Sequence, residues 1–130
     1  MAFCREAARA AERDGATLLI EGVGGVMAPM TPRETVADWM AALGVPAVLV
    51  VGSYLGAISH ALTAAEALTA RAIPIAAVVI SESDASGVAL CDTVESMGRF
   101  LPETRLMTLP RIEVGSEIWR DAPDMTAVLG

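Results

Sequence analysis

A chain of 130 residues, 54% of them hydrophobic, is long enough to bury a core and short enough to form a single domain. Its net charge of −7 disfavours a nucleic-acid partner, because binding to a phosphate backbone depends on clustered Lys and Arg. The longest apolar runs, residues 44–52 and 72–80, fall well short of the roughly 20 residues that cross a bilayer, and no signal peptide opens the chain. We therefore expect a cytoplasmic protein that binds neither nucleic acid nor membrane.

Three residue types are missing altogether, and their absence limits the chemistry. The sequence contains no Lys, Asn or Gln, so all 9 basic residues are Arg. The chain itself cannot supply the lysine of a phosphate-binding loop or an asparagine that reads adenine. Cys4, Cys91 and His60 have the spacing of neither a disulfide framework nor a zinc site.

Composition, periodicity and helix-breaking residues predict the regular elements. In chain order, we predict a helix over 2–13, a strand over 17–20, a loop over 22–33, a helix over 34–43, a strand over 47–51, a helix over 57–71, a strand over 75–80, a helix over 88–100, a strand over 106–109 and a loop-rich tail over 111–130.

Strands that alternate with helices of this length are typical of βαβ units. We predict a single α/β domain over residues 1–130, built as a parallel sheet with helices on both faces in a Rossmann-like three-layer arrangement. Glu21, Gly52, Ser81 and Pro110 follow the four predicted strands, so we place them at the carboxyl edge of this sheet. Ligands of open α/β sheets bind at that edge.

Glu21 and the glycine-rich stretch Gly22–Gly25 form the first candidate site. Glycines let backbone N–H groups approach a phosphate, and a carboxylate can hold Mg²⁺. A purely structural turn explains the same pattern. A dinucleotide-binding fingerprint is not expected, because Pro29 and Pro32 follow the glycines instead of a helix.

Residues 52–60 form the second candidate site, where a strand gives way to a helix whose first N–H groups favour an anion. In a structural alternative, Ser53 or Ser59 caps the helix. We expect a structural role for His60, and Tyr54 fits either a pocket wall or an ordinary turn.

Other polar residues have less specific settings. Asp38 is interpreted as a solvent-exposed helix charge. Ser81, Glu82 and Asp84 follow the predicted strand over 75–80, where they either accept hydrogen bonds from a base or ribose or form an ordinary polar turn.

Three blocks, in this order, resemble dethiobiotin synthetase, an enzyme family of the biotin pathway within the P-loop superfamily. They are Leu18–Gly25 with Pro29, Thr35–Trp39, and Val48–Leu62 with its Leu-Gly-x-Ile-x-His core. The resemblance covers about residues 2–110. It implies a partial P-loop NTPase-like fold, corresponding to the C-terminal part of a longer synthetase domain.

The family reaction closes a ureido ring with ATP and Mg²⁺: 7,8-diaminopelargonic acid takes up CO₂ as a carbamate, ATP phosphorylates it, and the second amine displaces phosphate. The resemblance implies that Glu21 is a ligand of Mg²⁺. It assigns to the nucleotide Gly22, Val23, Gly24, Ser81, Pro110, Arg111 and Ile112. It assigns to the substrate Gly25, Leu55, Gly56, Ala57, Ile58 and Ser59, the last five across the interface of a homodimer.

The departures from the family matter as much as the matches. The phosphate loop, the Mg²⁺-binding Thr and Asp and the catalytic lysines have no counterpart in the chain. Because such cations carry most of the stabilisation in phosphoryl transfer, we assign no catalytic residue and expect no turnover by the isolated chain. Ser59 and Ser81 stand where the family usually has Asn, which weakens adenine recognition and alters the substrate fit.

Two other functions remain open from the sequence. One is a related P-loop amidoligase of the cobyrinic acid diamide synthetase type, which shares the strand-Glu-Gly edge. The Leu-Gly-x-Ile-x-His turn favours the biotin enzyme over this type. The other is a non-catalytic binding or assembly module that keeps the fold and the dimer face.

Overall fold

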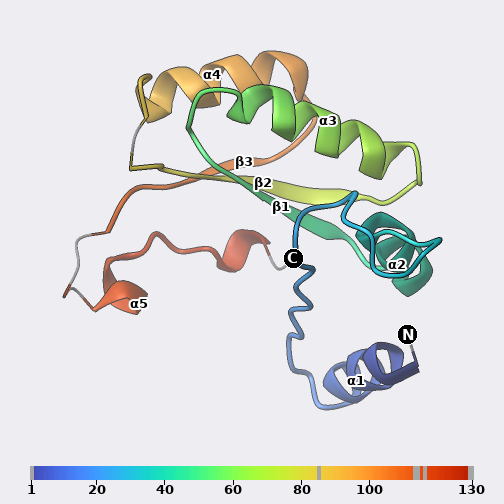
Figure 1. Cartoon of the computed structure of the whole chain (residues 1–130). Coiled ribbons are helices and arrows are strands. Elements are labelled where there is room, and N and C mark those ends of the chain that lie inside the picture. The colour runs from blue at the N-terminus through green and yellow to red at the C-terminus, as the bar shows by residue number, and fades with distance from the viewer. Residues whose placement is uncertain (1, 85, 113–114, 116, 129–130) are drawn as a thin grey trace.

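Three parallel strands form the centre of the protein (Figure 1). The computed structural model describes residues 2–84, 86–112, 115 and 117–128. The strands are β1 (Ala47–Val51), β2 (Ile75–Ser81) and β3 (Leu106–Leu109), and β2 pairs with both of the others. Helix α3 (Ala57–Thr69) connects β1 to β2, and α4 (Leu90–Phe100) connects β2 to β3. The predicted parallel α/β fold is confirmed.

The remaining elements are α1 (Ala2–Arg13), α2 (Val36–Leu43), the short α5 (Ile118–Asp121) and the 3₁₀ helix η1 (Thr126–Val128). Figure 1 shows α1 set apart from the sheet. The Arg5 guanidinium donates to the carbonyl oxygen of Ala42, in the last turn of α2, at 2.6 Å. A cation at this end satisfies an unpaired carbonyl and interacts favourably with the helix dipole. Among the described residues, no helix has the length and apolar character to cross a bilayer.

The core forms on both faces of β2, whose residues 77–80 are all buried. Helices α3 and α4 cover one face together (Figure 1). The core cluster on that side contains Ala61, Val78, Ile80 and Met97. On the other face, the C-terminal segment covers the sheet through Met125 and Val128, which pack with Ala77 and Val79. A strand buried on both faces explains the continuous apolar run in the sequence.

The predicted strand over residues 17–20 is wrong. Residues 16–22 form no strand, and among the described residues β1 pairs only with β2. A strand exists only where a neighbour receives its N–H and C=O groups. The described chain provides no such neighbour, so the side chains of Leu18 and Leu19 remain 40% and 73% exposed. Glu21 therefore does not end a strand of the sheet.

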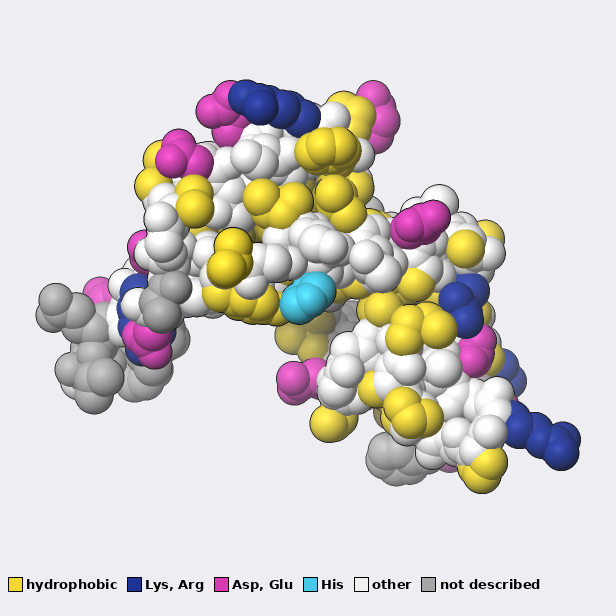
Figure 2. Space-filling view, turned by 45° about the horizontal axis from the view of Figure 1, so that its top comes forward, with side chains coloured by type: hydrophobic (Ala, Val, Ile, Leu, Met, Phe, Trp, Pro, Cys, Tyr) yellow, Lys and Arg dark blue, Asp and Glu magenta, His cyan; other side chains and the backbone are white. Residues whose placement is uncertain are grey.

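One edge and one face of β1 are open. In the part of the chain that the structure describes, strand β1 has a partner on one side only, and Val48 and Val50 are 38% and 63% exposed. Figure 2 shows further hydrophobic side chains at the surface of the face in view.

The boundaries of the other elements lie within two residues of those predicted. The predictions for β1, β3 and α1 match the structure, and β2 extends one residue further, to Ser81. Helix α2 begins at Val36 instead of residue 34, because Thr35 is its N-cap. Helix α3 ends at Thr69 and α4 begins at Leu90, each two residues short of the prediction.

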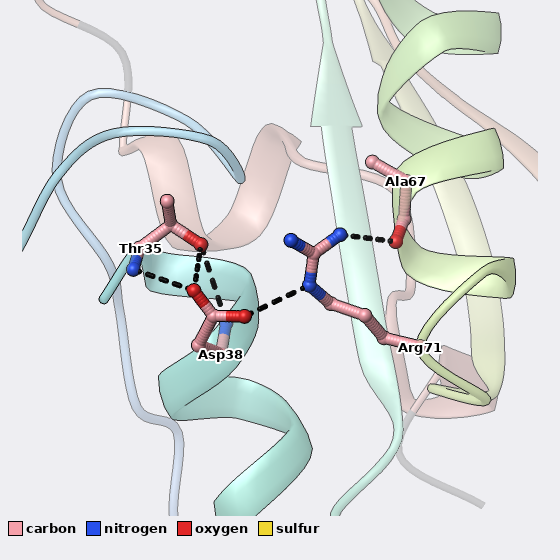
Figure 3. Close-up of polar contacts among 4 residues, drawn as sticks. All are labelled: Thr35, Asp38, Ala67 and Arg71. Carbon is pink, nitrogen blue, oxygen red and sulfur yellow. Dashed lines mark hydrogen bonds and ion pairs between the residues drawn. The ribbon is translucent and has the colours of Figure 1, made fainter. Parts of the chain in front are cut away.

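Asp38 joins α2 to the end of α3, as Figure 3 shows. Its Oδ2 accepts from the Thr35 N–H at 2.8 Å and the Thr35 hydroxyl at 2.7 Å, and the Asp38 N–H donates to Thr35 Oγ1 at 3.4 Å. Arg71 Nε donates to Asp38 Oδ1 at 3.0 Å, and Arg71 Nη1 donates to the carbonyl of Ala67 at 3.3 Å. The Asp38 side chain is 39% exposed, as expected of a helix charge near solvent, but both of its carboxylate oxygens are also bound, which the sequence did not indicate.

These bonds lower the pKa of Asp38 to about 2 from its usual 3.8. The largest cause is the backbone N–H of Thr35, followed by the Thr35 hydroxyl and the Arg71 guanidinium. The ionised form is favoured in the folded protein, so its contribution to stability is present above the usual pKa. That contribution is lost as the pH falls towards the pKa of the folded state.

We predict that Asp38→Asn lowers the Tm at pH 7 by roughly 4 °C, because the ion pair with Arg71 is lost and the capping box loses its charged acceptor. The difference in Tm between wild type and variant should shrink as the pH falls from about 4 to about 2, where Asp38 becomes protonated in the wild type. Thermal unfolding followed by circular dichroism at each pH measures both effects.

Glu66→Gln is the matched control, since Glu66 is an exposed acid on α3. It should melt like the wild type over the same pH range. A Tm difference for Asp38→Asn that stays constant down to pH of about 2 would contradict the assigned role of the carboxylate.

Candidate functional site at the carboxyl ends of the strands

The carboxyl ends of the three strands lie side by side. Val51 pairs with Ile80, and Ser81 pairs with Leu109. The segments that leave these strands begin at Gly52, after Ser81 and at Pro110, so the structure brings these three predicted edge positions together.

The segments after β2 and β3 are joined by polar contacts. The Glu82 N–H donates to the Leu109 carbonyl at 2.9 Å, and the Arg111 N–H donates to Glu82 Oε2 at 2.8 Å. Arg111 Nη2 lies 2.6 Å from Asp84 Oδ1. Ser81, Pro110 and Arg111, all predicted for the nucleotide, therefore share this part of the edge. The contacts with Arg111 could not be predicted from sequence motifs, because they depend on how β2 and β3 pair.

The turn before α3 ends at Gly56, which is the N-cap with a φ of 95°. Glycine suits this position because other residues rarely adopt positive φ. The Ala57 N–H donates to the Tyr54 carbonyl at 3.0 Å. Within the described chain the N–H groups of Ile58 and Ser59 have no hydrogen-bond partner. The alternative in which Ser53 or Ser59 caps the helix is wrong, because no side chain caps α3.

Tyr54 and His60 form a pair at this turn. The Tyr54 hydroxyl lies 3.0 Å from His60 Nδ1, and both side chains are exposed. Tyr54 and His60 were each considered from the sequence, but their contact with one another was not predicted. Leu55 between Tyr54 and Gly56 is 98% exposed, although its side chain is large and apolar.

Ser53 contacts the segment after β2 through its backbone and its side chain. The Ser53 N–H donates to Ser83 Oγ at 3.1 Å, and the Ser83 N–H donates to Ser53 Oγ at 3.0 Å. The Ser86 hydroxyl lies 2.8 Å from the Ser53 carbonyl oxygen and also contacts the carbonyl of Val88. Sequence reasoning missed Ser83 and Ser86, since neither belongs to a recognisable motif.

The glycine-rich loop lies against the start of α2. The Val36 N–H donates to the Ala28 carbonyl at 2.9 Å. Gly24 and Gly25 have φ values of 82° and 89°, which require glycine. A Cβ at Gly22 would lie 2.7 Å from Cγ1 of Val36, so close approach explains this glycine. The loop thus has structural reasons for its glycines, whatever ligand it holds.

Glu21, at the start of this loop, is exposed. The described residues contain no group of three or more His, Cys, Asp and Glu side chains that could hold a metal ion by themselves. Side chains of the described residues therefore do not complete the ligand shell of a Mg²⁺ at Glu21 by themselves.

We predict that Gly22→Ala destabilises the fold by about 1–3 kcal/mol, because the added Cβ forces the buried Val36 side chain to move. Gly87→Ala is the control, since nothing lies within 4 Å of a Cβ there and its φ is not positive. Urea unfolding of both variants measures the difference. Equal stability of the two variants would show that the loop does not pack on Val36 in solution.

Comparison with known proteins identifies related sequences. The family model described as "AAA domain" (AAA_26) matches residues 3–117. "ATP-dependent dethiobiotin synthetase BioD" of Caulobacter sp. (strain K31) is 51% identical over 107 residues, which are 82% of this chain and 46% of the relative. The protein of the same name from Acidiphilium cryptum (strain JF-5) is 51% identical over 106 residues, 80% of this chain and 45% of the relative.

A more distant relative of the same name, from Cellvibrio japonicus (strain Ueda107), is 36% identical over 114 residues, covering 88% of this chain and 48% of the relative. The chain therefore spans about half the length of the curated relatives it matches. The family model covers most of the chain and every predicted site residue. The chain therefore belongs to the AAA_26 family of AAA domains, and dethiobiotin synthetases are among its relatives.

Proposed function

We propose that this chain forms the parts of an ATP-dependent dethiobiotin synthetase that bind the substrate and the adenine base of ATP, and that the enzyme is cytoplasmic. The reaction is closure of the ureido ring from 7,8-diaminopelargonic acid and CO₂. The observation that carries the proposal is the 51% identity to the Caulobacter relative, which is named for this activity. No observation in the structure favours the amidoligase alternative.

The base of ATP fits the edge formed by β2 and β3. Ser81 ends β2, and Pro110, Arg111 and Ile112 leave β3 directly beside it. The Ser81 hydroxyl can both donate and accept one hydrogen bond, whereas the family's asparagine offers a two-point match to adenine. We therefore expect weaker base selectivity than in relatives with Asn.

The phosphates of ATP and Mg²⁺ fit the start of the glycine-rich loop. The backbone of Gly22, Val23 and Gly24 can approach a phosphate closely, because the two glycines have no side chain. Glu21 provides an exposed carboxylate. Mg²⁺ typically binds one or two carboxylates and completes its shell with phosphate oxygens and water, so a single acid is compatible with it. When bound, the ion neutralises charge on the phosphates.

The carboxylate tail of the substrate fits the start of α3. The free N–H groups of Ile58 and Ser59 lie at the positive end of the helix dipole, which favours an anion. The Gly56 and Ala57 backbone shapes the turn, and Gly25 approaches the substrate from the glycine-rich loop in this proposal. Leu55 is almost fully exposed, which suits a contact with the neighbouring subunit of a homodimer.

Turnover needs groups that this chain does not contain. Phosphoryl transfer depends on cations placed around the migrating phosphoryl group, and the sequence has no lysine. We propose that a phosphate-loop half, like the part of the relatives that this chain does not span, supplies them.

We predict that the purified chain closes no ureido ring with ATP, Mg²⁺, bicarbonate and 7,8-diaminopelargonic acid. Adding the N-terminal half of the Caulobacter sp. (strain K31) relative as a separate polypeptide should restore activity. Glu21→Gln should then lower kcat by about 100-fold, since a Mg²⁺ ligand is lost. Release of inorganic phosphate, together with mass spectrometry of dethiobiotin, measures turnover.

Two controls make this experiment decisive. The two halves of the Caulobacter relative, expressed separately, establish that the split enzyme works. Glu66→Gln in this chain should leave the restored activity unchanged. If the split relative is active but this chain never supports turnover, a non-catalytic binding or assembly module replaces the proposed enzyme.

We predict that Leu55→Glu weakens dimerisation of the restored enzyme by at least about tenfold, because a charge is placed in an apolar contact. Sedimentation velocity over a concentration series measures the dissociation constant. Val88→Glu is the control, since Val88 is also exposed, at 53%, but lies outside the turn. Equal effects of both changes would contradict an interface at Leu55.

A further inference from the structure

The turn that leads into α3 is held by the segment after β2, chiefly through Ser83. Ser53 is only 3% exposed, so its polar groups need partners inside the protein. Its N–H and its hydroxyl oxygen both bond to Ser83, at 3.1 Å and 3.0 Å, in a reciprocal pair. We call this pair the Ser53–Ser83 clasp.

The residues around the clasp leave it little freedom. A Cβ at Gly52 would lie 2.8 Å from Ser83 Oγ and 2.6 Å from Cδ1 of Tyr54, so only glycine lets the two segments approach this closely. The Ser86 hydroxyl adds a contact at 2.8 Å to the Ser53 carbonyl. All the polar groups of Ser53 thus have partners on the segment that leaves β2.

The same segment is tied on its other side to the end of β3. Glu82 Oε2 accepts from the Arg111 N–H at 2.8 Å, and Asp84 Oδ1 lies 2.6 Å from Arg111 Nη2. The segment therefore connects the turn before α3 to the edge beside Pro110. The proposed function puts the base of ATP at the edge beside Pro110, and at the turn it puts the tail of the substrate that the neighbouring subunit binds.

We propose that Ser83 is a positioning residue that fixes the turn before α3, and with it the free N–H groups of Ile58 and Ser59, relative to the sheet of its own subunit. The inference rests on the proposed function for its catalytic consequence, but not for the clasp itself. Ser83→Ala removes the acceptor for a buried N–H and leaves that donor unpaired. The turn then relaxes, while the contacts of Glu82 and Asp84 with Arg111 remain.

The first test uses the chain alone. Amide exchange measured by NMR should become about tenfold faster or more at Ser53 in Ser83→Ala, because its hydrogen-bond acceptor is gone. Ser83→Thr keeps the hydroxyl and should restore slow exchange. Exchange of the buried Thr93 and Met97 amides in α4 should not change, which separates a local effect from unfolding.

The second test uses the restored two-polypeptide enzyme. Ser83→Ala should raise the KM for 7,8-diaminopelargonic acid about fivefold, the factor that one neutral hydrogen bond is worth, with the KM for ATP changing less than about twofold. Ser83→Thr should return the substrate KM to the wild-type value. Gly52→Ala should reproduce the Ser83→Ala pattern, and Ser96→Ala, a change on α4 away from the clasp, should have no effect.

The outcomes separate the two proposals. Unchanged exchange at Ser53 in Ser83→Ala overturns the clasp, whatever the enzyme does. Faster exchange with equal rises in both KM values, or with none, overturns the positioning role. If the wild-type chain supports no turnover even with the N-terminal half of the relative added, the proposed function fails. The exchange experiment then still decides whether the clasp holds the turn.

Discussion

The position of β2 between two parallel neighbours is the constraint on which the rest of the structure depends. A central strand must satisfy its N–H and C=O groups on both sides and bury side chains on both faces. Residues 77–80 meet this requirement, with α3 and α4 over one face and Met125 and Val128 over the other. Because all three strands run in parallel, their carboxyl ends meet at one edge, and the segments that leave them become neighbours.

That arrangement also explains why contacts between distant residues define the candidate site. Ser53 and Ser83 leave adjacent strands, as do Glu82 and Arg111, so each pair can bond across the edge. The Asp38–Arg71 ion pair likewise joins residues far apart in the sequence, because it connects α2 to the segment just after α3. Backbone pairing sets the distances, and the polar side chains then lock the segments between the elements.

Most of the fold follows from local pattern. The apolar runs of β1 and β2 and the stripe of α3 predict their elements to within two residues, because burial and periodicity act at the same positions. The prediction of a strand over residues 17–20 failed, since its sequence favours a strand but the described chain offers no partner strand. Local preference does not form a ladder by itself.

The candidate site was likewise predictable only where it depends on local sequence. Sequence motifs located the turn before α3, the glycine-rich loop and the strand ends, because glycines and apolar boundaries leave a local signal. They gave no indication of Ser83 or of the Tyr54–His60 pair, since those contacts depend on the relative placement of two segments. The ion pair of Asp38 went unpredicted for the same reason: its partner Arg71 lies 33 residues away.

The open edge of β1 has a consequence for handling the protein. Its five residues, Ala47–Val51, carry no charge, and the edge presents backbone groups to any extended chain that meets it. Natural sheets commonly guard such an edge with lysine, proline or a bulge. Here Pro46 and an irregularity in the pairing between Ala47 and Val48 affect only the start of the strand, so among the described residues the edge at Leu49–Val51 remains open. Concentrated preparations of the chain are therefore exposed to strand-to-strand association through β1, and a lysine in place of Val50 is the natural safeguard.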